Sequence, residues 1–235
     1  MVKVILLLCL AGLVFGQSDS LILQPDAAAG YDAEIYGSGY ASRNYGVRIE
    51  TTFMSNYDSK QLILFDLSSI PAGSVIDSAY ITHTLWFQSY TSVFYSAAIL
   101  QLWREGNKNH TGATSGEVTY NHCRYDTLWG TAGCNLIGTD RTAPLDSQVV
   151  ATGSLPRQEI IDITQTLRYI FAAPNNYGLV QWAPDARQLL GYSSDNATPS
   201  NRLKLSVYYR AEAPATGAKW REVVIDGKLQ TWRTQ

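Results

Sequence analysis

The sequence is poor in charged residues: Asp, Glu, Lys and Arg make up only 16% of its 235 residues, and the formal net charge is −2. It contains no run or stripe of Lys and Arg, so it lacks the basic surface by which proteins hold nucleic acids. It also contains no apolar run of the roughly 18 residues that a membrane-spanning helix requires. We therefore expect neither a nucleic-acid partner nor a membrane span.

Residues that carry common catalytic chemistry are also scarce. There are three histidines, and no Gly-x-Ser-x-Gly, His-Glu-x-x-His or phosphate-binding-loop motif is present. The Asp and Glu residues show no spacing that singles out the pair of carboxylates a glycosidase needs. The sequence therefore predicts a protein that is not an enzyme and requires no cofactor.

The N-terminus has the pattern of a secretory signal peptide. The positive Lys3 precedes an apolar run over residues 4–15, and the small residues Val14 and Gly16 suit a cleavage site. A membrane anchor is the alternative, but the run is too short for one. We expect residues 1–17 to be removed and the rest of the chain to be secreted, with an extracellular location.

Cysteine is rare, with three residues in the chain, and Cys9 would leave with the signal peptide. Cys123 and Cys134 then form a lone pair, which in an oxidising compartment predicts a disulfide. Closing a loop of about 11 residues contributes on the order of 3 kcal/mol in the chain-entropy model. A metal site is the weaker alternative, because Cys-x-x-Cys spacing is absent and only His122 lies beside the pair.

Period-two alternation and short apolar runs bounded by turn residues recur along the chain and predict β-strands. The predicted strands are 21–23, 33–36, 47–51, 61–65, 79–87, 96–103, 117–120, 148–154, 159–163, 177–182, 188–193 and 202–209. One short helix is predicted between Asp162, which can cap it, and Pro174, which ends it. The fold class is therefore all-β: an antiparallel, jelly-roll-like β-sandwich in one domain over residues 18–210.

Residues 211–235 form a separate tail. A linker rich in Ala and Pro leads to a segment that alternates on both sides of Asp226-Gly227, a strong signal for a β-hairpin. An isolated hairpin is marginal in water, so this one should pack on its own domain or on another molecule, and disorder is the remaining alternative. In the second case Trp220, Val224 and Trp232 are the candidate assembly residues.

Several short motifs follow one another along the chain, and one of them occurs twice. Asn-Tyr-Gly occurs at 44–46 and again at 176–178, and Leu-Phe-Asp-Leu-Ser-Ser-Ile-Pro occupies 64–71. Glu-Val-Thr-Tyr-Asn follows at 117–121, and an alternating strand closes the pattern at 201–209. In order and spacing the pattern resembles the DNRLRE-type domain, also called the family 96 carbohydrate-binding module.

The resemblance implies an extracellular, non-catalytic β-sandwich that binds polysaccharide or glycan at a cell surface or in a matrix. It covers residues 20–209 and departs from the family in the long insert 107–147 and in the tail. The alternative is a structural subunit of an extracellular fibre or sheath. The tail or strand 21–23 would then self-associate by extending a neighbour's sheet.

Sugar binding needs aromatic faces beside groups that bond hydroxyls. Two tyrosine- and tryptophan-bearing segments supply candidates: Tyr31, Tyr36, Tyr40 and Tyr45 in a Gly-rich stretch, and Tyr125 and Trp129 in the loop that the disulfide would close. The alternative for each ring is that it covers a sheet edge or fills the core.

Three aspartates are candidate metal ligands. Oxygen ligands favour Ca²⁺ in secreted sandwiches, and Asp26, Asp32 and Asp66 could converge near one end of the fold. No EF-hand or repeat calcium motif is present. A Ca²⁺ site is therefore a hypothesis that the structure has to test.

Two Asn-x-Thr sequons, at Asn109 and Asn196, lie in predicted loops. If the protein enters a glycosylating secretory pathway, both are expected to be accessible. Sequons also arise by chance, so their position in the fold decides their meaning.

Overall fold

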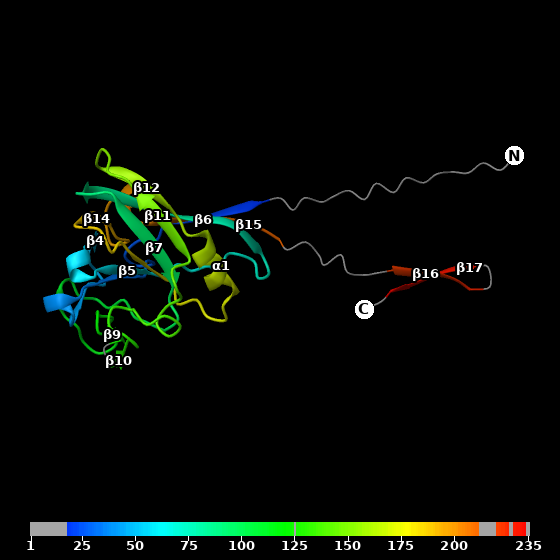
Figure 1. Cartoon of the computed structure of the whole chain (residues 1–235), viewed down its shortest axis with the longest axis horizontal. Helices are drawn as coiled ribbons and strands as arrows, with labels where there is room; N and C mark the ends of the chain where they lie inside the picture. Colours follow the sequence, from blue (N-terminus) through cyan, green and yellow to red (C-terminus); the bar gives the residue numbers. More distant parts are fainter. Residues whose placement is uncertain (1–17, 125, 212–219, 226–227, 234–235) are drawn as a thin grey trace.

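The computed structural model describes residues 18–124, 126–211, 220–225 and 228–233. Strands between residues 19 and 210 form two stacked antiparallel sheets (Figure 1), so the predicted all-β sandwich is confirmed. The first sheet runs β1 (Asp19–Leu23), β15 (Lys204–Arg210), β6 (Val75–Gln88), β14 (Leu189–Tyr192) and β4 (Glu50–Phe53), with β12 (Arg157–Asp162) also paired to β6. The second runs β11 (Asp146–Val150), β7 (Ser92–Ala98), β13 (Leu179–Trp182), β5 (Lys60–Ile63) and β2 (Asp32–Ile35).

Smaller elements decorate the sandwich. Two short ribbons pair β3 (Arg43–Asn44) with β8 (Thr111–Gly112), and β9 (His122–Arg124) with β10 (Thr127–Leu128). Among the described residues, the 3₁₀ turns are η1 (Ser38–Tyr40), η2 (Ser55–Tyr57) and η3 (Pro199–Asn201). In the tail, β16 (Trp220–Ile225) pairs with β17 (Lys228–Arg233), which confirms the predicted hairpin strands.

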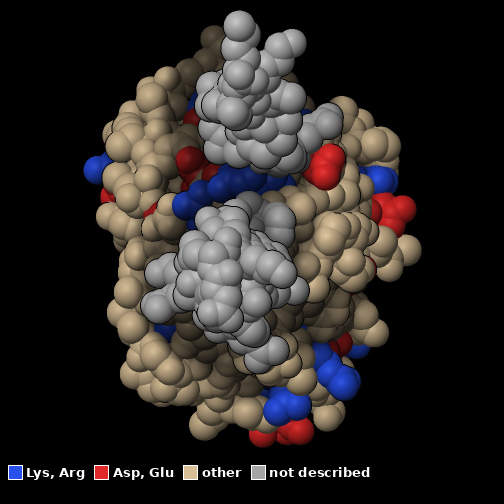
Figure 2. Space-filling view, turned by 90° about the vertical axis from the view of Figure 1, so that its right-hand side faces the viewer, with Lys and Arg blue, Asp and Glu red and all other residues tan. Residues whose placement is uncertain are grey.

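The surface carries few charges, as the composition requires. On the face shown in Figure 2, neutral side chains cover most of the described atoms, and acidic and basic groups occupy a minor part.

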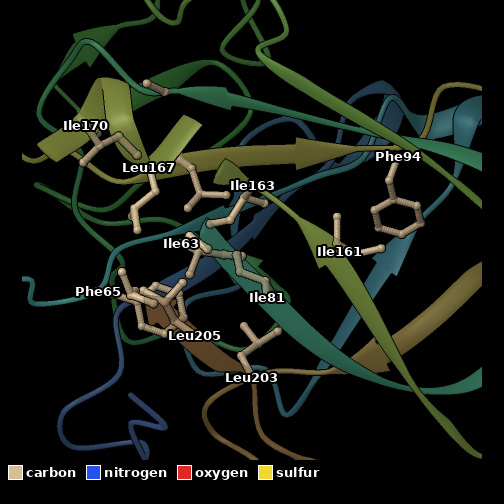
Figure 3. Close-up of a cluster of buried hydrophobic side chains, with 14 of the residues drawn as sticks. Ile63, Phe65, Ile81, Phe94, Ile161, Ile163, Leu167, Ile170, Leu203 and Leu205 are labelled. Carbon is tan, nitrogen blue, oxygen red and sulfur yellow. The ribbon is translucent and has the colours of Figure 1, made fainter. Parts of the chain in front are cut away.

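The main core lies between the two sheets (Figure 3). Ile81 on β6 and Leu205 on β15 come from the first sheet, and Ile63 on β5 and Phe94 on β7 come from the second. All four are at most 2% exposed, and each buried side chain of this size contributes about 1.5–3 kcal/mol. Alternate residues of these strands face inward, which is why the period-two pattern identified them.

A second apolar cluster covers the outer face of the second sheet. Leu62 and Val180 point away from the main core because they neighbour the inward-facing residues along their strands. They pack against Trp103, Trp129 and other side chains from the long connection after β7. The strands β5 and β13 are therefore buried on both faces, which explains why the apolar run that begins at Leu62 in β5 does not alternate.

The predicted helix is confirmed as α1 (Thr164–Ala172), which packs against β6, β7 and β11. The carboxylate of Asp162 accepts a hydrogen bond from the Thr164 amide at 2.8 Å. The amides of Gln165 and Thr166 donate instead to the Asp146 carboxylate, at the start of β11. The first turn of α1 is thus capped from a neighbouring strand. No helix among the described residues is long and apolar enough to cross a bilayer.

The two sheets meet along β11 and β12. There the side chain of Gln148 on β11 bonds the backbone edge of β12, as a neighbouring strand would. Nε2 of Gln148 donates to the Ile160 carbonyl at 2.7 Å, and Oε1 accepts from the Asp162 amide at 3.0 Å. The amide group of Gln148 therefore makes the pair of bonds that a peptide unit would make on the edge of β12.

Four predicted strands differ markedly in the structure. Those expected at 96–103 and 148–154 end at Ala98 and Val150, so residues 100–103 and 151–154 are not strand. The strand expected at 47–51 begins only at Glu50, and Ile49 lies exposed in the preceding loop. No strand forms at 117–120. There, Oγ1 of Thr119 accepts hydrogen bonds from the amides of Asn121 and His122, so side-chain bonding stabilises a turn.

Candidate ligand-binding site

An open, aromatic pocket of about 260 Å³ lies where the loops around β2, β3 and η2 meet. We call it the tyrosine pocket. Its lining consists of Tyr36, Tyr40, Tyr45, Arg48, Met54, Tyr57 and His110. Three of the four tyrosines predicted from the Gly-rich stretch are therefore brought together, whereas Tyr57 and His110 were not anticipated.

The first Asn-Tyr-Gly turn builds the pocket. Asn44 is fully buried, and its Nδ2 donates to the carbonyls of Glu105 and Val118 at 2.5 and 2.9 Å. Its Oδ1 accepts from the amides of Gly46 and Lys108 at 3.2 and 3.0 Å. The Asn44 side chain thus fixes the segment that contains Lys108 against the Asn-Tyr-Gly turn, in which Tyr45 follows Asn44.

The rings form a floor and a rim. Tyr36 and Tyr45 are 6% and 3% exposed, and their centroids lie 4.8 Å apart, so they make the floor. Tyr40 and Tyr57, 5.6 Å apart, are half-buried, while His110 is exposed. The His110 ring stacks on Tyr45 at 5.1 Å and 25°. The rim therefore offers aromatic surface to a ligand.

Arg48 connects the pocket to a buried carboxylate. It donates to Oε2 of Glu34 at 3.0 Å and to the Tyr36 hydroxyl at 2.8 Å, and lies 3.5 Å from a Glu50 oxygen. Burial raises the pKa of Glu34 to about 7, although Arg48 opposes that rise. Glu34 also accepts a hydrogen bond from the Thr52 amide. One Glu34 oxygen therefore bonds Arg48, and the other bonds the backbone of β4.

A second guanidinium lies at the rim. Arg43 lies 4.9 Å above the Tyr40 ring and donates from its NH1 nitrogen to Nε2 of His110 at 2.7 Å. Because this nitrogen accepts, His110 is neutral; desolvation and the charges of Arg43 and Arg48 lower its pKa. In the described part of the chain, no carboxylate pairs with Arg43. Its remaining donors can therefore bond a ligand.

The other predicted aromatic residues lie elsewhere. The ring of Tyr31 packs on Trp103 at 4.8 Å, and its hydroxyl donates to the Trp103 carbonyl at 3.2 Å. Trp129 is only 4% exposed, and its Nε1 donates to the Thr119 carbonyl, so its prediction as a ligand platform is wrong. Its loop folds inward over the second sheet. Tyr125 lies outside the described residues.

The predicted disulfide is absent: Cys123 and Cys134 are both free, buried thiols. Sγ of Cys123 contacts the Thr127 carbonyl at 3.3 Å, and burial raises the pKa of both thiols. The loop is organised by the fully buried Asp140, whose carboxylate accepts hydrogen bonds from backbone amides at Gly130, Thr131 and Leu136. Loop closure by side-chain bonding thus replaces the expected covalent link.

The three predicted metal ligands do not assemble as a trio. Asp26 accepts from the amides of Ala28 and Ala29, and Asp66 accepts from the Ser68 amide, so both carboxylates stabilise exposed turns. Asp32 is buried and lies instead with Glu105 and Asp195, their ligand atoms all within 4.8 Å of one another. This group is the acidic trio.

The acidic trio has the chemistry of a hard cation site. Burial raises the pKa of Glu105 to about 8 and of Asp195 to about 6, and the charge of Asp32 adds to both increases. Oδ2 of Asp195 is buried and has no hydrogen-bond partner among the described residues. Three grouped carboxylates, one of which has an oxygen without a hydrogen-bond partner, fit Ca²⁺, which prefers oxygen ligands.

The two sequons differ in exposure, and the candidate assembly residues lie in the tail hairpin. Asn109 is exposed. Asn196 is only 8% exposed, and its Oδ1 accepts from the Thr198 amide at 3.0 Å, so the expected accessibility of this sequon is wrong. Trp220 and Val224 lie in β16 and Trp232 in β17, but their side chains are outside the described part of the chain.

No known family model matches the chain, and no curated protein is similar to it. The resemblance to the DNRLRE-type domain therefore stays a prediction from short motifs.

Proposed function

We propose that the protein is a secreted, non-catalytic β-sandwich that binds polysaccharide or glycan in the tyrosine pocket. The observation that carries the proposal is the aromatic rim of Tyr40, Tyr57 and His110 beside the Arg43 guanidinium. Aromatic faces pack on the apolar faces of sugar rings, and guanidinium donors bond hydroxyl or acidic oxygens. The low charge of the chain agrees with a largely uncharged ligand.

The buried carboxylate that bonds Arg48 beside the pocket supports binding rather than turnover. Glu34 is 2% exposed and bonds Arg48 and the Thr52 backbone. Glycosidases place two carboxylates on either side of the scissile bond. A buried Glu34 held in this way lacks the access that such chemistry requires.

The test is a polysaccharide array with the chain from residue 18, followed by calorimetry on each hit. Tyr40→Ala and Tyr57→Ala should each weaken binding about 3- to 10-fold, the equivalent of one aromatic contact. Tyr208→Ala is the matched control, because Tyr208 is an exposed tyrosine on β15. Binding that survives both pocket variants would place the ligand elsewhere.

We also propose that the acidic trio holds one Ca²⁺ ion, which would fix β2 to the loops that carry Glu105 and Asp195. The support is the grouping of the three carboxylates, together with the buried Oδ2 of Asp195 that has no hydrogen-bond partner among the described residues. Calorimetric titration with CaCl₂ tests it directly, and Asp195→Asn should weaken binding at least 10-fold. If titration of the parent protein with Ca²⁺ or Mg²⁺ gives no heat of binding, the proposal is contradicted.

A structural subunit is the second candidate function. β1 lies at the end of the first sheet, so one of its backbone edges is free among the described residues, and Ile22 is 64% exposed. The hairpin of a second copy could extend that edge. Light scattering of chains with and without residues 211–235 tests it: loss of assembly on truncation supports strand addition, and two monomers exclude it.

A further inference from the structure

One sequon lies on the rim of the tyrosine pocket. Asn109 is exposed, and its side chain makes no hydrogen bond with the described residues. The next residue is His110, whose ring lines the pocket. Consecutive Cα atoms are about 3.8 Å apart, so a sugar on Asn109 begins within one residue of the aromatic rim.

The segment that carries the sequon is held in place. The amide of His110 donates to the Asn44 carbonyl at 3.1 Å, and Thr111 pairs with Asn44 in the β3–β8 ribbon. The φ angle of His110 is +62°, so the chain turns sharply there and the ring lies over Tyr45. The position of Asn109 relative to the pocket is therefore set by the ribbon.

The second sequon provides an internal comparison. Asn196 accepts hydrogen bonds from the Thr198 amide and from Nδ2 of Asn201, and it is 8% exposed. A glycan on its amide would have to displace packed neighbours, whereas Asn109 projects into solvent.

We propose that Asn109 is an N-glycosylation site and that its glycan covers the tyrosine pocket. The Asn109 amide nitrogen attacks the anomeric carbon of a lipid-diphosphate-linked oligosaccharide. The new N–C bond replaces the C–O bond to the diphosphate, which leaves with the lipid, and the amide proton is lost. This inference rests on the proposed function of the pocket, because the attached sugar is a tethered version of the ligand class.

Tethering gives the glycan an advantage over free ligand. A group attached through a short flexible link has an effective concentration on the order of millimolar. A pocket with weak affinity for single sugars is then largely occupied by its own glycan. Removal of the glycan exposes Tyr40, Tyr57 and the His110 ring.

The experiment uses residues 18–235 behind a secretion leader in a glycosylating host. Thr111→Val destroys the sequon and leaves Asn109 unchanged, while Thr111→Ser keeps it and is the matched control. Peptide mapping should find a glycan on Asn109 in the parent and in Thr111→Ser, none in Thr111→Val, and little or none on Asn196. A bare Asn109 in both sequon-bearing forms overturns the proposal.

Covering of the pocket is measured without any ligand. Diethyl pyrocarbonate modifies exposed neutral imidazoles, and His110 should react at least about 3-fold more slowly in Thr111→Ser than in Thr111→Val, because a tethered group competes for the surface. Equal rates overturn the covering.

Binding then separates the two proposals. Thr111→Val should bind array polysaccharides about 3-fold or more tightly than Thr111→Ser, while the two chains bind equally when made without glycosylation. If no form binds any polysaccharide, the proposed function fails, and protection of His110 alone decides whether the glycan covers the pocket.

Discussion

Nε2 of His83 on β6 lies 2.8 Å from Oε1 of Gln181 on β13, and this hydrogen bond joins the two sheets inside the main core. Both side chains are at most 1% exposed. Because Gln181 accepts, Nε2 carries the proton, and Nδ1 has no partner among the described residues. Burial lowers the pKa of His83 to about 4.

Acidification should therefore destabilise the fold through His83. An unfolded imidazole takes up a proton near pH 6.5, whereas the folded one resists until about pH 4, so stability falls across that window. The loss by pH 4.5 amounts to about 2 kcal/mol. His83→Gln keeps a donor for Gln181 but does not titrate. Urea unfolding at pH 7 and 4.5 should show a smaller loss for this variant than for the parent.

Comparing the parent with His83→Gln separates the effect of His83 from groups that stabilise the fold as the pH falls. The raised pKa of Glu34 means that the folded state binds its proton more readily, so that carboxylate favours folding as the pH falls through about 7. It is common to the parent and to His83→Gln. Identical pH-dependent losses in both would exclude His83 as the source.

Gln148 should protect an open strand edge. Gln148→Ala removes both hydrogen bonds to β12 and should lower the free energy of unfolding by about 1–2 kcal/mol. It also bares the backbone of Ile160 and Asp162, so light scattering should detect association that grows with concentration. Ser147→Ala, at the exposed neighbouring position, is the control and should change neither quantity.

Asn44 and Asn176 occupy equivalent places in the two Asn-Tyr-Gly turns but serve different regions. Nδ2 of Asn176 donates to the Phe65 carbonyl, and its Oδ1 accepts from the Gly178 amide, both at 2.9 Å. Alanine at either position leaves buried backbone groups unpaired and should cost about 1–3 kcal/mol in urea unfolding. Only Asn44→Ala should also reduce glycan binding, since Asn44 holds the pocket. Equal binding by both variants would contradict that assignment.

The two thiols should be unreactive in the native protein. The thiolate is the reactive form, and burial raises the pKa of both Cys123 and Cys134. Ellman's reagent should label no thiol in native residues 18–235 and both thiols after denaturation without a reductant. Zero labelling after denaturation would mean that the pair is oxidised in solution.

The strands of the sandwich could be predicted because their side chains alternate between core and solvent, as Leu205 and Tyr208 do on β15. Trp129 could not be placed in this way. Its loop has no period, and its burial depends on the outer face of a sheet built from distant segments. The turn at Thr119 was also missed, because a hydroxyl supplies bonds that a strand pattern cannot indicate.

The pocket was predicted only in part, because only some of its residues are close together in the sequence. Tyr36, Tyr40 and Tyr45 are close in the sequence, so their proximity follows from one loop. Tyr57 and His110 join them only because Asn44 bonds the segment of residues 105–108 and because β4 lies beside β5. Long-range contacts of this kind leave no local signal.

The dependence of the pocket on Asn44 has a consequence for divergence. The segment from Asn107 to Gly112 adds no strand to either sheet and is joined to the neighbouring turn through the buried Asn44 amide, the bond from the Val47 amide to the Lys108 carbonyl, and a two-residue ribbon. Its length and composition can therefore change between related chains while the sandwich is inherited intact. Ligand preference and fold stability can be selected separately in this architecture.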